Sequence, residues 1–216
     1  GSYKKYPKFM NEFFSDDFYD SQMPLGWSEK DWFAYLKKSN AEIAKFASLY
    51  SINRSRGLSL EDIAQMAGWA FPDGEGDSPE EDDDSEFSDE PWTLLNHPLY
   101  IITRGLLKCL QEHLGRVIEE TQIAPMHVWE MSKVITQISM FISLAVNSTD
   151  LSEDLLARCN YKMTSLMLNN FIAQVAQIPT PGSEQGRERM RRINYIIFDL
   201  RQLCLNLAER SAIEKK

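Results

Sequence analysis

VITQISMFISLAV, residues 134–146, contains no charged residue and lies in the most apolar part of the chain, residues 126–146. The apolar residues of this run recur at helical spacing, as Val134, Ile138, Phe141 and Ala145. The charge-free run is shorter than the roughly 18 residues that a membrane span needs, and hydroxyl and amide side chains interrupt it. We therefore predict a buried central helix of a helical bundle, with a proline in its first turn.

Four long helical patterns with short connections occupy the second half of the chain. We predict helices at about 98–121, 125–147, 149–177 (starting at Thr149 or Ser152) and 184–212. Helices joined by so few residues pack antiparallel to their neighbours. The predicted fold class is all-α, an up-down four-helix bundle over residues 92–216 with an aromatic-rich helical N-terminal segment packed on it.

Three of these helices have an apolar stripe that we expect to face the core. In the first helix the stripe is Leu99, Ile102, Leu106, Leu110, His113 and Val117. In the third it is Leu156, Cys159, Met163, Leu166 and Ala173. In the fourth it is Met190, Ile193, Ile197, Leu200, Cys204 and Leu207, which follow the 3–4 spacing of a heptad.

The N-terminal segment, residues 3–71, is rich in aromatic side chains, and the first 71 residues hold 15 of the 24 in the chain. We predict a short helix near 7–15, a helix over about 29–51 that Ser28 caps, and a short helix from Ser59 to Ala67. Large side chains let a short lid bury much area on a bundle. The alternative is an aromatic groove for a peptide or a flat ligand, to which Trp27 and Trp32 would contribute.

Residues 72–91 separate these two parts and are predicted to form an acidic, disordered loop. The stretch from Asp73 to Glu90 has eleven acidic residues and no basic one. Without them the formal net charge would change from −9 to +2. The acidic balance disfavours nucleic acid and anionic membranes as partners, because both attract clustered positive charge. The segment is either a solvated linker or a docking site for a basic partner.

One short motif resembles a DNA-binding element. LEDIAQMAG, residues 60–68, is similar to the first helix and turn of helix-turn-helix repressors. That resemblance implies a following recognition helix with small and polar residues. Here Trp69 and the acidic segment follow instead, so the sequence does not predict DNA binding.

The sequence predicts no metal site, cofactor or known catalytic motif. In the bundle, His97 and His113 would lie ~22–24 Å apart along one helix, which is too far for one ion. His113 falls within an apolar stripe and is either a core histidine or part of a polar cavity. Cys109, Cys159 and Cys204 lie on three different helices, where they form a thiolate site or serve as small buried residues.

Four arginines crowd the start of the last predicted helix: Arg187, Arg189, Arg191 and Arg192. Positive charge at a helix N-terminus opposes the helix dipole, so a negative group should offset it. Glu184 and Glu188 could do so locally, as could a phosphate-bearing ligand, a partner, or the acidic segment of a second copy in a homodimer.

From these features we expect a cytoplasmic, non-catalytic interaction or regulatory protein. Three cysteines without paired spacing do not suggest disulfides, which favours a reducing compartment. The expected contact surface is the aromatic segment with Trp27 and Trp32, or the arginine cluster, facing a protein partner or a second copy. The alternative is a ligand-binding protein or enzyme that uses a polar cavity around His113.

Overall fold

The computed structural model describes residues 27–69 and 93–213, so the predicted helix at 7–15 and the acidic segment lie outside it. Within those two ranges the chain forms six α-helices and no strand. They are α2 (Glu29–Asn53), α3 (Leu60–Ala67), α4 (Pro98–Thr121), α5 (Pro125–Asp150), α6 (Asp154–Val175) and α7 (Glu184–Ile213). Two short 3-10 turns, η2 (Arg54–Arg56) and η3 (Leu94–Asn96), precede α3 and α4.

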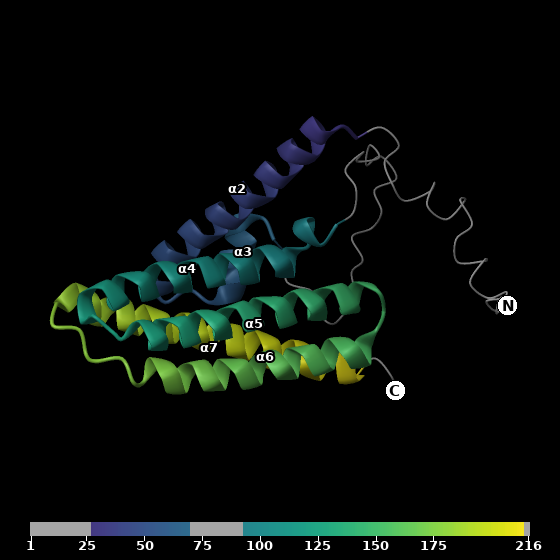
Figure 1. The fold of residues 1–216 in the computed structure, drawn as a ribbon. Helices are drawn as coiled ribbons and strands as arrows, with labels where there is room; N and C mark the ends of the chain where they lie inside the picture. The colour runs from purple at the N-terminus through teal and green to yellow at the C-terminus, as the bar shows by residue number, and fades with distance from the viewer. Residues whose placement is uncertain (1–26, 70–92, 214–216) are drawn as a thin grey trace, which may run out of the picture.

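Helices α4 to α7 form a closed up-down bundle, in which α4 packs on α5, α5 on α6, α6 on α7 and α7 on α4 (Figure 1). The connections are short enough that each helix returns beside the previous one. The predicted fold class is confirmed, and the helix boundaries agree with the predicted ones to within a few residues. The main difference is that α5 continues to Asp150 and α6 begins only at Asp154, after Ser152 adopts a left-handed backbone (φ 59°).

The core of the bundle follows the apolar periodicity of its helices. Ile138 of α5 is fully buried, as are Leu106 and Leu110 of α4 and Leu200 of α7. Burying such side chains stabilises the fold by about 1.5–3 kcal/mol each relative to leaving them exposed. The inward stripes predicted for 98–121 and 184–212 are therefore buried, except that His113 is only half-buried and Met190 is partly buried.

The inward face predicted for α6 is wrong. Leu156, Cys159, Met163, Leu166 and Ala173 all lie on its exposed side. Its buried face carries Ala157, Tyr161, Thr164, Leu168, Phe171 and Val175 instead. That second stripe contains two aromatic rings, so turning it inward buries more area than the predicted stripe would.

The N-terminal helices cover one side of the bundle. Figure 1 shows α2 crossing over α4, with α3 tucked beside them and α6 on the side of the bundle away from α2. Ser28 forms a capping box with Asp31, as predicted from their spacing. Ser59 forms a second capping box with Asp62. Phe46 of α2 is fully buried against α4 at Gly105, where a Cβ atom would lie 2.5 Å from Cδ1 of the Phe46 ring.

No α-helix in the ranges 27–69 and 93–213 is long and apolar enough to cross a membrane. The apolar segment 134–146 lies within α5, where its Ile135, Ile138 and Ile142 are buried in the bundle.

Candidate functional site

The structure places the predicted site residues in two separate regions. Trp27 and Trp32 lie at the start of α2, whereas His113 lies on α4 near the first three turns of α7, which carry the four arginines. His113 and Arg192 line the same pocket, but neither tryptophan lines it. The predicted residues therefore do not form one site.

The aromatic residues at the start of α2 pack on one another. The ring centroids of Trp27 and Trp32 are 5.0 Å apart, and each packs edge-on against Tyr35, at 5.6 and 6.0 Å. The Tyr35 hydroxyl is hydrogen-bonded to the Thr93 side chain, and the Ser39 hydroxyl donates to the carbonyl of Leu95. These contacts attach the chain entering α4 to α2, so the cluster has a structural role that its sequence alone did not reveal.

The arginines at the start of α7 are mostly paired within their own helix. Arg187 and Arg191 contact the carboxylate of Glu184 at 2.9 and 3.0 Å, and Arg191 and Arg192 contact Glu188 at 3.3 and 3.2 Å. The Arg187 guanidinium lowers the pKa of Glu184. Exposed pairs of this kind contribute roughly 0–1 kcal/mol each. The negative groups that the helix dipole requires are thus supplied locally.

A glutamate from α4 also compensates the N-terminus of α7. The Glu120 carboxylate accepts hydrogen bonds from the Ser183 N–H at 2.8 Å and from its hydroxyl at 3.0 Å. Those bonds lower the pKa of Glu120. Ser183 Oγ in turn accepts from the N–H of Gly186, at 2.8 Å. Arg189 is the cluster member without an ion pair to any described residue, although its charge acts on Glu120 and His113.

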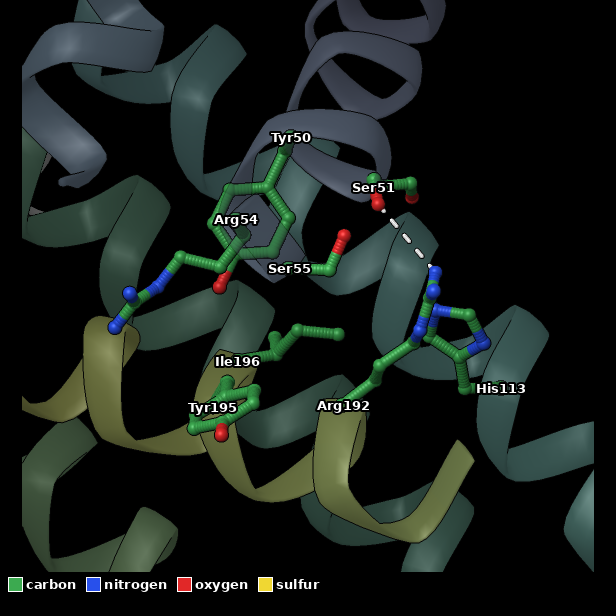
Figure 2. Close-up of a pocket in the computed structure, with 8 residues that line it drawn as sticks. All are labelled: Tyr50, Ser51, Arg54, Ser55, His113, Arg192, Tyr195 and Ile196. Carbon is green, nitrogen blue, oxygen red and sulfur yellow. Dashed lines mark hydrogen bonds between the residues drawn. The ribbon is translucent and has the colours of Figure 1, made fainter. Parts of the chain in front are cut away.

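His113 lines a small pocket between α2, α4 and α7. The pocket has a cavity volume of only about 10 Å³ and is lined by Tyr50, Ser51, Arg54, Ser55, His113, Arg192, Tyr195 and Ile196 (Figure 2). Burial lowers the pKa of His113, and the positive charge of Arg192 adds to that effect. The imidazole is therefore neutral at pH 7, next to a guanidinium that donates a 3.4 Å hydrogen bond to the Ser51 carbonyl.

The second arginine of this pocket belongs to a buried polar junction. Asp199 of α7, 6% exposed, accepts hydrogen bonds from Arg54 Nε at 2.7 Å, from its terminal nitrogen at 3.0 Å, and from the Tyr50 hydroxyl at 2.6 Å. The Arg54 guanidinium also lies 5.4 Å from the ring centroid of Tyr195. In Figure 2 it points away from His113. This junction fixes the end of α2 to α7.

The cysteines do not form a thiolate site. Cys109 and Cys204 are buried, and Cys159 is exposed on another side of the bundle. Burial raises the pKa of Cys204 to about 12 and also raises that of Cys109, so both thiols stay protonated at neutral pH. No three histidine, cysteine or acidic side chains in the part of the chain that the structure describes are close enough to hold a metal ion.

The largest feature that the sequence analysis missed is an exposed apolar stripe on α6. Leu156, Cys159, Met163, Leu166, Asn170 and Ala173 are spaced alternately by three and four residues, and all six are exposed. A stripe with this spacing is typical of a helix that packs against another helix. The 3–4 spacing of these residues is visible in the sequence, but there it predicts a stripe that faces the core.

Apolar side chains of α5 extend this stripe. On a projection of about 100° per residue, Met140 and Leu144 lie on the edge of α5 away from Ser139, whose hydroxyl contacts Arg104 of α4. The side of α5 that contacts α6 lies further round the helix in the same direction, because α4 contacts the Ser139 edge. On α6, Met163 lies on the edge away from Asn169, which contacts Arg201 of α7.

The two helices are antiparallel, so Met140 and Met163 lie at the same level, about 15 Å from the α5–α6 connection. Leu144 and Cys159 form a second level closer to that connection. We call the exposed side chains of Met140, Leu144, Leu156, Cys159, Met163 and Leu166 the outer apolar face.

In comparisons with known proteins, the chain matches no family model, no curated protein and no solved structure. The functional interpretation therefore rests on the geometry of this chain.

Proposed function

We propose that this protein is a non-catalytic interaction protein that binds a helix of a protein partner on its outer apolar face. The observation that carries the proposal is the exposed 3–4 stripe on α6, from Leu156 to Ala173. Contiguous apolar surface on a folded protein often marks an interaction site. The stripe runs along α6 beside apolar residues of α5. An amphipathic helix could bind there by placing its own apolar residues against these positions.

The two contact surfaces expected from the sequence have less support. Trp27 and Trp32 pack against Tyr35, in a cluster whose contacts hold the chain that enters α4. Three of the four arginines form ion pairs with glutamates of their own helix, so a partner would have to replace those pairs. The outer apolar face has no such partner among the described residues, because neither α2 nor α3 packs on α6.

Ligand binding or catalysis around His113 is the alternative, and it too has less support. The cavity of about 10 Å³ lies far below the roughly 300–1,000 Å³ that is usual for ligand sites. Its two arginines are already paired, Arg54 with Asp199 and Arg192 with Glu188. A small-molecule ligand would therefore find few unpaired polar groups there.

The test is a selection of helical peptides on the full chain, followed by mapping with two matched variants. Leu166 is 54% exposed on α6, and Ile52 is 52% exposed on α2. Leu166→Glu places a charge in the middle of the stripe and should weaken the selected peptides about tenfold or more, since a desolvated unpaired charge costs several kcal/mol. Ile52→Glu, which changes an equally exposed residue elsewhere, should leave their affinity unchanged.

Both substitutions lie on the surface, so stability should stay within about 0.5 kcal/mol of the parent and any loss of binding can be assigned to the contact. The proposal fails if no peptide is selected, or if the selected peptides bind the Leu166→Glu variant as tightly as the parent. Peptides that lose affinity when Arg189 and Arg192 are changed to Gln, but not with Leu166→Glu, would move the contact to α7.

A further inference from the structure

The outer apolar face carries positive charge and no negative charge along most of its length. Residues 131–149 of α5 contain one charged residue, Lys133, and residues 155–175 of α6 contain two, Arg158 and Lys162. None of these positions is acidic, although the whole chain has a formal net charge of −9. The acidic residues nearest to the face lie toward its ends: Glu130 and Asp150 in the first and last turns of α5, and Glu153 and Asp154 at the start of α6.

The three basic residues lie on both sides of the apolar stripe. On α6, Arg158 and Lys162 follow its α7 edge, about 100° and 60° around the helix from Cys159. On α5, Lys133 is exposed, and its ammonium nitrogen lies 5.6 Å from the ring centroid of Trp129, which is also exposed. A helix lying along the α6 stripe would therefore have Arg158 and Lys162 on its α7 side, and Lys133 on its α5 side, in line with Met140.

The Arg158 side chain has a hydrogen-bond donor without an acceptor among the described residues. Its Nε atom is buried, and no described residue accepts a hydrogen bond from it. A buried donor without an acceptor is costly, and a carboxylate is the acceptor that a guanidinium binds best. The residue as a whole is only partly buried, so a carboxylate at the surface could pair with the rest of its guanidinium group.

We infer that the partner is an acidic amphipathic helix, with apolar residues at 3–4 spacing and glutamate or aspartate on the flanks of that stripe. The inference rests on the proposed function and names the chemistry of its partner. Opposite charges would meet on both sides of the apolar contact, which gives specificity and speeds association. A second copy of this chain fits less well, because its own outer apolar face would bring basic residues against basic residues.

The experiment uses the full chain and two designed helical peptides with identical leucines at 3–4 spacing. The flanking positions are glutamate in one peptide and lysine in the other. Binding is followed by fluorescence anisotropy and by the rate at which neutral iodoacetamide alkylates Cys159, measured by mass spectrometry. Cys159 suits this purpose because it lies within the stripe and is exposed, whereas Cys109 and Cys204 are buried.

We expect the acidic peptide to bind about tenfold more tightly than the basic one at low ionic strength and to slow the alkylation of Cys159. The difference should shrink between about 0.05 and 0.5 M salt, because exposed charges are screened. Changing Lys133, Arg158 and Lys162 together to Gln should remove the preference. The matched control changes Lys30, Lys37 and Arg56, three exposed basic residues of α2 and η2, to Gln and should retain it.

The outcomes separate the two proposals. If both peptides bind equally, or the basic one binds better, the inference is overturned and the interaction surface stands. If neither peptide binds or protects Cys159, both proposals fail.

Two further results would also overturn the inference. If Cys159 in the peptide-free monomer is alkylated much more slowly than an exposed cysteine in a short peptide, another segment of the same chain occupies the face. Protection of Cys159 that increases with protein concentration, together with dimers in sedimentation, would show that a second copy does.

Discussion

The bundle has two outer sides that differ in how they are covered. On one side, α2 and α3 lie over α4, and the side chains that meet there, such as Phe46, Tyr50 and Ile63, are buried. On the other side, α5 and α6 expose Met140, Leu166 and their apolar neighbours, and neither α2 nor α3 packs on α6. Among the described residues, helices thus cover one side of the bundle and leave the other side exposed.

The covered side shows how a helix docks on this bundle. Helix α2 approaches α4 closely at Gly105. Its C-terminal end is held by the Arg54–Asp199 ion pair, and the Asp199 carboxylate also accepts a hydrogen bond from the Tyr50 hydroxyl. Apolar side chains provide most of the area buried between α2 and the bundle, and the charged pair fixes the position of the helix end. We propose that a partner helix would repeat this arrangement on α5 and α6, with its carboxylates meeting Lys133, Arg158 and Lys162.

The largest expected effect separates the inner from the outer side of α5. Ile138 is 0% exposed and Met140, two residues later, is 49% exposed. Ile138→Asp places an unpaired charge in the core at a cost of several kcal/mol, enough to unfold a domain of ordinary stability. Circular dichroism should show a chain without a cooperative thermal transition.

Met140→Asp is the matched control, because the same carboxylate would then remain in water. Its free energy of unfolding should stay within about 0.5 kcal/mol of the parent in urea titrations. If both variants melt like the parent, the placement of α5 is wrong. If Met140→Asp also unfolds the protein, the outer apolar face is covered by something that the stability of the fold requires.

The helices were predictable because their signals are local. Ser28 and Ser59 as caps, Pro98 and Pro125 in first turns, and Gly68 as a terminator act within a few residues. The short connections then make the order of an up-down bundle follow from the sequence. Long-range approach of α2 to α4 had no comparable signal, because Gly105 and Phe46 are far apart in the chain.

The candidate site was harder to predict, because α6 carries two apolar stripes. Periodicity identifies both, Leu156 to Ala173 and Ala157 to Val175, but it does not say which one faces the core. The answer depends on the shape of the space that α5 and α7 leave for Tyr161 and Phe171. The pairing of the α7 arginines was visible in part, since Glu184 and Glu188 lie one turn away.

A second prediction tests the covered side through two glycines of α4. Gly105→Ala would place a methyl group 2.5 Å from the buried ring of Phe46, so the ring or α2 must move. Overpacking of this kind typically costs about 1–3 kcal/mol. Urea unfolding should therefore show a clear loss of stability, and a near-ultraviolet signal of the aromatic residues should report the shift of α2.

Gly115→Ala on the same helix is the control. A Cβ atom there meets nothing within 4 Å, so alanine should stabilise the helix by about 0.5–1 kcal/mol. Equal stabilisation by both substitutions would show that α2 does not approach α4 as described. In that case the docking of α2 on α4 could no longer serve as the model for how a partner helix binds α5 and α6.

The smallest expected effect concerns His113, at the edge of the covered side. Burial and the charge of Arg192 lower its pKa below the usual value of about 6.5, so below that pH the unfolded chain binds more protons than the folded one. His113 therefore lowers stability as the pH falls through 6.5 toward its folded pKa. The loss is at most about 1.4 kcal/mol for each unit by which the pKa is lowered.

His113→Gln should reduce the difference in stability between about pH 7 and pH 5, and the imidazole signal in an NMR titration should give the folded pKa directly. A pKa at or above 6.5 would contradict the burial of this side chain and the effect of the Arg192 charge on it. Repeating the titration with inorganic phosphate also compares the two functional proposals. An anion bound between Arg192 and His113 would raise the pKa by favouring the charged imidazole, and such a rise would favour the ligand-binding alternative. An unchanged pKa would leave the outer apolar face as the better supported site.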